Sequence, residues 1–181
     1  MFDRAELLAA LAAHGRVVRV VIAEARGSSP REVGAAMLVW ASGQAGTIGG
    51  GALEHLATER ARAMLAEGGP QRFDRVPLGP AIGQCCAGAV ASLSERYEAG
   101  VLLPDDVLAR PVQGDGPMPL AVKRLMALQR GQGVAPSAQL LQGWLVEPVA
   151  RPARQIWIWG AGHVGRALVS VLAPLPDFAI T

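Results

Sequence analysis

The two cysteines of the chain, Cys85 and Cys86, are adjacent and stand inside the glycine-flanked run Gly83-Gln84-Cys85-Cys86-Ala87-Gly88. Consecutive Cα atoms lie about 3.8 Å apart, whereas a disulfide favours about 5.5–6 Å, so this pair makes a poor crosslink. A thiolate is a soft metal ligand and a strong nucleophile, and flanking glycines let a bound group approach the backbone. The pair therefore predicts a soft-ligand or sulfur-handling site.

Other interpretations of Cys85 and Cys86 stay open, namely a small apolar pair in a core turn and a strained vicinal disulfide. A zinc site is disfavoured because zinc-binding cysteines usually have about two to four residues between them. The histidines that would have to complete such a site, His14, His55 and His163, show no ligand spacing. A thiol redox pair is disfavoured too, because such pairs use a C-x-x-C spacing.

A second candidate site is the run Gly49-Gly50-Gly51, which precedes a segment of helical period. Unblocked backbone N–H groups and the positive end of a helix dipole together favour an anion such as a phosphate. A tight strand-to-helix turn that needs positive φ is the alternative. Ser28, Ser29 and Arg31 follow a predicted strand, and their hydroxyls and guanidinium would add to an anion site, although alone they are typical of an ordinary turn.

A third candidate is the G-x-G-x-x-G run of Gly160, Gly162 and Gly165, which follows an apolar stretch and opens a helical one. This order is typical of a dinucleotide fold and predicts a nucleotide loop. His163 occupies a variable position of the loop, from which it could face a ligand. The chain ends at Thr181, before the second strand and the acidic residue that would bind a ribose hydroxyl, so we expect only the truncated start of a Rossmann-like domain.

Composition narrows the function further. The chain has 181 residues, of which 51% are hydrophobic and 18% charged, so it can bury a core and form one complete domain with part of a second. A net charge of +2 without a basic cluster, together with few aromatic residues, disfavours nucleic acid as a partner. No signal peptide or apolar stretch of spanning length is seen, and two thiols fit a reducing cytoplasm.

The elements that must position these residues follow from local patterns. Asp3 and Glu6 resemble a capping box, and with Gly15 they predict a helix over 3–14. Apolar runs predict strands over 16–25, 35–40, 72–78 and 89–97, a short stub at 47–48 after turn residues 42–46, and a helix from the triple glycine to Gly68.

The predicted fold class is α/β. Residues 1–99 are expected to form an N-terminal α/β domain with a mixed sheet. Residues 100–153 are expected to be a connector, with a helical piece over 120–129 and a strand over 140–146. Residues 154–181 are expected to hold the first strand and helix of an incomplete Rossmann-like domain, whose exposed apolar surface favours a homodimer.

Four motifs in this order and at these intervals resemble the XdhC/CoxI family. They are Gly27-Ser28-Ser29-Pro30-Arg31-Glu32, Thr47-Ile48-Gly49-Gly50-Gly51-Ala52-Leu53-Glu54, Pro77-Leu78-Gly79-Pro80 leading to Gly83-Gln84-Cys85-Cys86, and Gly160-Ala161-Gly162-His163-Val164-Gly165 with the residues after it. The resemblance spans nearly the whole chain, although the segment 100–150 contributes little. The family run Gln-Cys-Cys-Gly-Gly has Ala87 in place of its first glycine here.

The resemblance implies a cytoplasmic bacterial chaperone rather than an enzyme. Such a protein binds the molybdenum cofactor (molybdopterin), protects it while a cysteine desulfurase supplies the terminal sulfido ligand, and delivers it to apo xanthine dehydrogenase. The implied cofactor-binding residues are Gln84, Cys85 and Cys86, with the two cysteines at the metal, and Gly49, Gly50, Gly51, Ser29 and Arg31. In this hypothesis the glycines hold the cofactor phosphate, and the thiolates approach the metal at the other end of the same ligand.

The competing hypothesis is an NAD(P)-dependent oxidoreductase with an unusual N-terminal domain. It depends on the loop of Gly160, Gly162, His163 and Gly165, and NAD(P) would bind only if the Rossmann-like domain were completed. The sequence does not decide which cysteine would contact molybdenum.

Overall fold

The computed structural model describes residues 1–79, 88–112, 116–150, 154–175 and 178–181. Its largest element is a five-stranded sheet with the order β3-β2-β1-β5-β4. The central strand β1 is long, and its residues 17–23 are buried. The strands are β1 Arg16–Arg26, β2 Ala36–Trp40, β3 Gly43–Gly46, β4 Gln71–Pro77 and β5 Ala89–Glu98.

The α/β class is confirmed, but the main sheet is not mixed as the sequence predicted. Every pairing between its described strands is antiparallel. Parallel neighbours need a long crossover, whereas a short connection joins antiparallel neighbours. Among the connections that the structure describes, α2 forms a helical crossover from β3 to β4, which lie at opposite edges of the sheet and do not pair.

The two faces of the sheet are covered by different helices. Alternate side chains of β1 point to opposite faces, and Val18, Val20 and Ile22 pack with residues of α2 (Gly51–Glu67). Val17 packs instead with Leu7 and Leu11 of α1 (Arg4–His14). The predicted boundaries of α1 are confirmed, since the Asp3 side chain accepts a hydrogen bond from the Glu6 N–H and Gly15 ends the helix at φ 75°.

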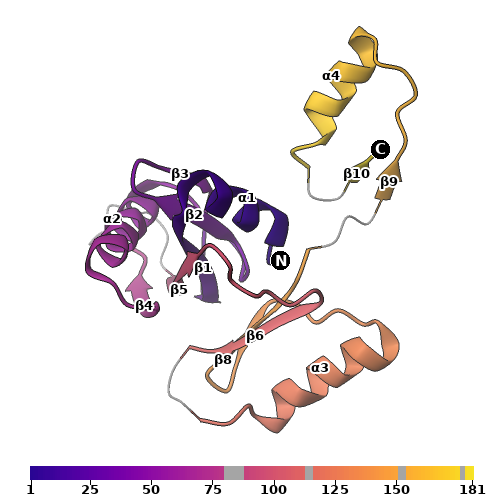
Figure 1. Ribbon diagram of the computed structural model, residues 1–181. Coiled ribbons are helices and arrows are strands. Elements are labelled where there is room, and N and C mark those ends of the chain that lie inside the picture. The colour runs from indigo at the N-terminus through magenta and orange to yellow at the C-terminus, as the bar shows by residue number, and fades with distance from the viewer. Residues whose placement is uncertain (80–87, 113–115, 151–153, 176–177) are drawn as a thin grey trace.

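A second sheet, of order β6-β8-β7, forms within residues 100–150 and packs on the first (Figure 1). Its strands are β6 Val107–Pro111, β7 Gln139–Leu141 and β8 Trp144–Pro148, and α3 (Leu120–Gln132) covers its outer side. Val21 and Leu93 of the first sheet share a core with Val112 and Leu145. The segment expected to be a connector is therefore joined to the main sheet by a common core.

Two local predictions in these sheets differ from the structure. The strand expected over 140–146 is a hairpin, because Gln142 (φ 49°) and Gly143 (φ 81°) form a tight turn between β7 and β8, which is the backbone geometry of two-residue hairpins. Likewise, the turn expected over 42–46 is shorter, and Gly43–Gly46 pairs with β2 as strand β3, so the strand lies before the stub expected at 47–48, which is not a strand.

The C-terminal residues form a small βαβ unit that stands apart from both sheets (Figure 1). It consists of β9 (Arg154–Ile156), α4 (His163–Leu172) and β10 (Phe178–Ile180), and β9 and β10 pair in parallel. We expected no second strand, but the last residues of the chain supply one. No helix in the described ranges has the length and apolar character needed to span a membrane.

Candidate functional site

The three glycines before α2 form a turn that only glycine adopts without strain. Gly49, Gly50 and Gly51 have φ of 121°, 75° and 62°, in the region that side chains disfavour. A Cβ on Gly49 would lie 2.6 Å from the Pro30 side chain. We call residues 49–51 the glycine turn. Its backbone and the start of α2 confirm the strand-to-helix turn that the sequence indicated.

Two N–H groups of this turn, together with that of Ile48 before it, are already bound to an anion, the carboxylate of Glu54. Its Oε1 accepts hydrogen bonds from the N–H of Ile48 at 2.9 Å, of Gly49 at 3.2 Å and of Gly50 at 2.8 Å. The Thr47 hydroxyl donates a fourth hydrogen bond to the same oxygen. The turn therefore has the geometry of an anion site, and in this structure an internal side chain fills it.

The environment of Glu54 favours its charged form. Burial by itself raises the pKa of this carboxyl. The hydrogen bonds from the Thr47 hydroxyl and from the backbone of Gly50, Ile48 and Gly49 outweigh that effect and lower the pKa below its usual value. Glu54 was missed at the sequence level. The available signal was an acidic residue in the first turn of a helix, where the helix dipole stabilises it.

Ser29 and Arg31 lie beside the glycine turn, as the anion-site hypothesis requires. They belong to the loop of residues 27–34, here called the serine loop, whose Pro30 packs against Gly49. Their polar groups are engaged locally, however. The Ser29 hydroxyl donates to the Arg31 carbonyl at 2.8 Å.

Arg31 forms its ion pair with the adjacent Glu32. The guanidinium donates to the two Glu32 carboxylate oxygens at 3.0 and 3.2 Å. These hydrogen bonds lower the pKa of Glu32 to about 2. The stem of Arg31 lies on the glycine turn while its charge points to Glu32, so an anion at the turn would gain Arg31 only if that exposed pair opened.

Gln84, Cys85 and Cys86 fall in the cysteine segment, residues 80–87, which lies outside the described residues. The residues that border it are described. Leu78 N–H donates to the Gly88 carbonyl at 2.8 Å, which closes the base of the segment. A Cβ on Gly88 would lie 2.3 Å from the Ser28 carbonyl oxygen and 2.4 Å from that of Arg26. The Gly88 border of the cysteine segment therefore abuts the serine loop, and Leu78 at the other border is hydrogen-bonded to Gly88.

Three sequence-predicted pieces thus meet at one end of the main sheet: the serine loop, the glycine turn and the borders of the cysteine segment. A cavity of about 90 Å³ lies near the start of β5 there, lined by Glu24, Arg26, Arg75, Ala89, Val90 and Ala91. This volume is below the approximately 300–1,000 Å³ of ligand pockets. A shared cavity between the thiols and the glycine turn stays a prediction.

The loop of Gly160, Gly162, His163 and Gly165 belongs to the separate βαβ unit. A Cβ on Gly165 would lie 2.3 Å from the Gly160 carbonyl oxygen, so the third glycine permits the close helix–strand contact typical of dinucleotide folds. His163 is the first residue of α4 and is exposed. The structure does not bring this loop to the end of the sheet where the other candidates meet (Figure 1).

Comparison with known proteins identifies the N-terminal part of the chain. Residues 10–76 match the family model described as "XdhC and CoxI family". This part of the chain is therefore similar to that family. The resemblance inferred from the motifs is confirmed here, and the match includes the serine loop, the glycine turn and Glu54 but neither the cysteines nor the loop at 160–165.

A solved structure and a search of curated proteins complete the comparison. The chain resembles a Bacillus halodurans protein described as a xanthine dehydrogenase, with 29% sequence identity and a TM-score of 0.47. The similarity covers 54% of this chain and 31% of the other, so the chain spans about a third of the length of that protein. No curated protein matches.

Proposed function

We propose that this protein is an accessory factor for xanthine dehydrogenase maturation that binds molybdopterin at the end of the main sheet. In this role it is a cytoplasmic chaperone and not an enzyme. The cofactor is its cargo, held while a cysteine desulfurase supplies sulfur and then passed to apo xanthine dehydrogenase. The observation that carries the proposal is the meeting of the serine loop, the glycine turn and the borders of the cysteine segment, two of which lie in the family-matched region.

The chemistry of the glycine turn suits the phosphate of the cargo. Three consecutive N–H groups already hold a carboxylate oxygen of Glu54, which supports their capacity to bind an oxyanion. A phosphate would have to replace that carboxylate. In this proposal Glu54 satisfies the turn when no cargo is bound, and Ser29 and Arg31 lie next to the incoming phosphate.

The cysteines would serve the metal end of the cargo. A thiolate is a soft ligand, and Cys85 and Cys86 are the soft side chains of a segment whose end, at Gly88, lies beside the serine loop. Elsewhere, in the part of the chain that the structure describes, no group of three or more His, Cys, Asp or Glu is placed to hold a metal ion. Gln84 precedes the pair and would contribute its amide.

The test is the cofactor content of purified variants. Full-length protein from a molybdenum-replete host is oxidised, and the fluorescent molybdopterin product is measured in wild type, Cys85→Ala and Cys86→Ala. Arg130→Ala, an exposed change on α3, serves as control, and circular dichroism confirms folding. We expect at least one cysteine variant to lose cofactor while the control keeps it. Equal content in all four proteins would refute the cysteine role.

A dimer is part of the proposal because α4 exposes an apolar face. Val164, Leu168 and Val171 follow helical spacing and are 75%, 45% and 67% exposed. Soluble monomers rarely leave such a face uncovered, so we propose that a second copy covers it. Light scattering after size-exclusion chromatography should give a dimer mass for wild type and a monomer mass for Leu168→Asp. A monomer mass for wild type would contradict the proposed dimer but would leave the proposal of cofactor binding untouched.

An NAD(P)-dependent oxidoreductase is the second candidate. It is favoured by the parallel pairing of β9 and β10 and by the contact of Gly165 with Gly160, which together are the start of a dinucleotide fold. Titration with NADH, followed by its fluorescence, tests this function. Binding that Gly162→Asp abolishes would support the oxidoreductase, and unchanged NADH fluorescence would dismiss it.

A further inference from the structure

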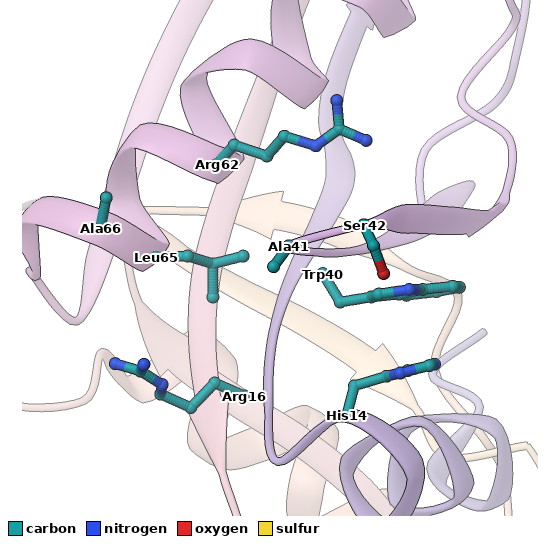
Figure 2. Close-up of a pocket in the computed structure, with 8 residues that line it drawn as sticks. All are labelled: His14, Arg16, Trp40, Ala41, Ser42, Arg62, Leu65 and Ala66. Atoms are coloured by element: carbon teal, nitrogen blue, oxygen red, sulfur yellow. The ribbon is translucent and has the colours of Figure 1, made fainter.

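A separate cleft lies at the far end of α2 from the glycine turn (Figure 2). It has a volume of about 450 Å³ and is formed where the end of α1, the start of β1, the end of β2 and the last turns of α2 meet. Leu65 is 14 positions after Gly51, so at a helical rise of about 1.5 Å per residue the two lie roughly 21 Å apart along α2. The cleft is therefore independent of the proposed cofactor site.

The wall of the cleft is a fixed aromatic stack. The Trp40 and His14 rings are parallel, with centroids 4.2 Å apart and an interplanar angle of 8°. Gly43 also lies close to Trp40, because a Cβ on Gly43 would lie 2.9 Å from the indole ring. His14 therefore occupies one face of the indole, and the stacked pair forms a wall of the cleft.

Two arginines give the cleft an uncompensated positive charge. Arg16 and Arg62 are exposed, and neither has an ion-pair partner among the residues that the structure describes. Two acidic residues placed near these arginines by register or helical spacing contact other side chains. Glu98, opposite Arg16 in the sheet register, pairs with Arg96 at 3.5 Å. Glu59, one turn before Arg62, lies 3.5 Å from His55, a contact that is an ion pair only when the histidine is protonated.

The positions of the two guanidinium groups indicate which kind of ligand the cleft would favour. Figure 2 shows the two guanidinium groups on opposite sides of Leu65, which points toward Ala41 between them. Charges on both sides of an apolar side chain suit an extended ligand better than a single small anion. An extended segment with acidic side chains on both sides of an apolar one would place each charge beside an arginine and its apolar side chain on Leu65.

We propose that this cleft docks an acidic segment of a partner protein, anchored by one apolar side chain on Leu65 and Ala41. Tryptophan and arginine are enriched at protein interfaces and among their energetic hot spots, and exposed arginines also guide an acidic partner during encounter. The proposal does not depend on the proposed cofactor function, because none of the cleft residues belongs to that site.

The test uses the full chain and a defined probe. The probe is a fluorescein-labelled acidic heptapeptide with a central leucine and two glutamates on each side, and binding is measured by fluorescence anisotropy at low salt. The variant is Arg16→Gln with Arg62→Gln. The matched control is Arg124→Gln with Arg130→Gln, which removes two exposed charges from α3. We expect the cleft variant to bind about three- to tenfold more weakly than wild type, and the control to bind like wild type.

Two further probes separate the alternatives. A peptide with serine for the central leucine should bind more weakly if the apolar floor is used. Pyrophosphate should displace the labelled peptide only at concentrations that act through general screening. Equal loss in both arginine variants would overturn the proposal in favour of unspecific attraction. Tight displacement by pyrophosphate, with no effect of the leucine, would overturn it in favour of a small-anion site.

Discussion

The Arg19 guanidinium donates two hydrogen bonds to the Glu147 carboxylate, at 2.8 and 3.0 Å, although the two residues are 128 positions apart. Arg19 lies on the central strand of the main sheet and Glu147 on the middle strand of the second. Their side chains are 3% and 0% exposed. Arg110 of β6 adds an ion pair to Glu147 at 2.6 Å and another to Glu95 of β5. A buried charge network therefore fixes the two sheets against each other.

Replacement of Glu147 should destabilise the protein strongly. Glu147→Gln leaves Arg19 without its anionic partner in a buried position, and breaking one side of a buried pair costs about 3–5 kcal/mol. Urea denaturation would measure the loss in the free energy of unfolding. The exposed Glu59→Gln on α2 should change it by less than about 0.5 kcal/mol. A loss below 1 kcal/mol for Glu147→Gln would mean that the network contributes little.

The same carboxylate predicts a loss of stability in acid. Burial alone would raise the pKa of Glu147, but the charges and hydrogen bonds of Arg19 and Arg110 hold it at about 2, below its usual 4.5. A carboxyl whose pKa is lower in the folded state stabilises the protein at a pH above its unfolded-state pKa. This stabilisation is lost as the pH falls toward the folded-state pKa. As the pH falls from about 4.5 to 2, protonation of Glu147 should lower the free energy of unfolding by about 3 kcal/mol. The free energy of unfolding, measured by urea denaturation at a series of pH values, should decrease more steeply with falling pH in wild type than in Glu147→Gln.

The contrast between α1 and this network shows what local pattern can predict. Asp3, Glu6 and Gly15 act within a few positions of one another, so capping chemistry placed α1 correctly from sequence alone. The pairing of Arg19 with Glu147 depends on how two sheets stack, which no local spacing encodes. Strand β6 was missed for a related reason, since Arg110 and Pro111 make a five-residue strand look polar until the buried partner of Arg110 is known.

The candidate site shows the same division. The glycine turn was predicted because glycines before a helical pattern are a local signal. That Glu54 fills the turn depends on its side chain folding back over the helix start, an orientation that sequence spacing permits but does not fix. The domain boundaries at 99 and 153 stay predictions, and the core shared by Val21, Leu93 and Leu145 favours placing residues 1–150 in one cooperative unit.

Gly88 should tolerate no side chain. A Cβ there would lie within 2.4 Å of two carbonyl oxygens, those of Ser28 and Arg26, and the backbone of β1 and β5 cannot move without breaking the pairing of Arg26 with Ala89. We expect Gly88→Ala to destabilise the protein by about 1–3 kcal/mol. Gly116→Ala, where a Cβ would meet open space, is the control. Equal unfolding midpoints for the two variants would show that the serine loop moves to accommodate the added side chain.

Glu54 should stabilise the start of α2. Glu54→Ala removes the acceptor shared by Ile48, Gly49 and Gly50 N–H, a change comparable to the loss of a helix cap, about 0.5–2 kcal/mol. Glu54→Gln keeps an acceptor oxygen and should lose less, because only the charge-assisted part of the bonds disappears. Urea denaturation measures the change in the free energy of unfolding for each variant. Faster hydrogen exchange of the Gly50 amide would show that the change arises at the glycine turn. An unchanged exchange rate in Glu54→Ala would contradict the cap role.

The anion capacity of the glycine turn predicts an opposite response to phosphate in the same variant. Wild type holds its own carboxylate at these N–H groups, so added inorganic phosphate has to compete with Glu54 and should change the unfolding temperature little. In Glu54→Ala the N–H groups are released, and phosphate that binds only the folded state should raise the unfolding temperature in proportion to its occupancy. Chloride at matched ionic strength separates this effect from screening. If phosphate and chloride act alike on Glu54→Ala, the turn is a structural cap alone and the cargo phosphate must be held elsewhere.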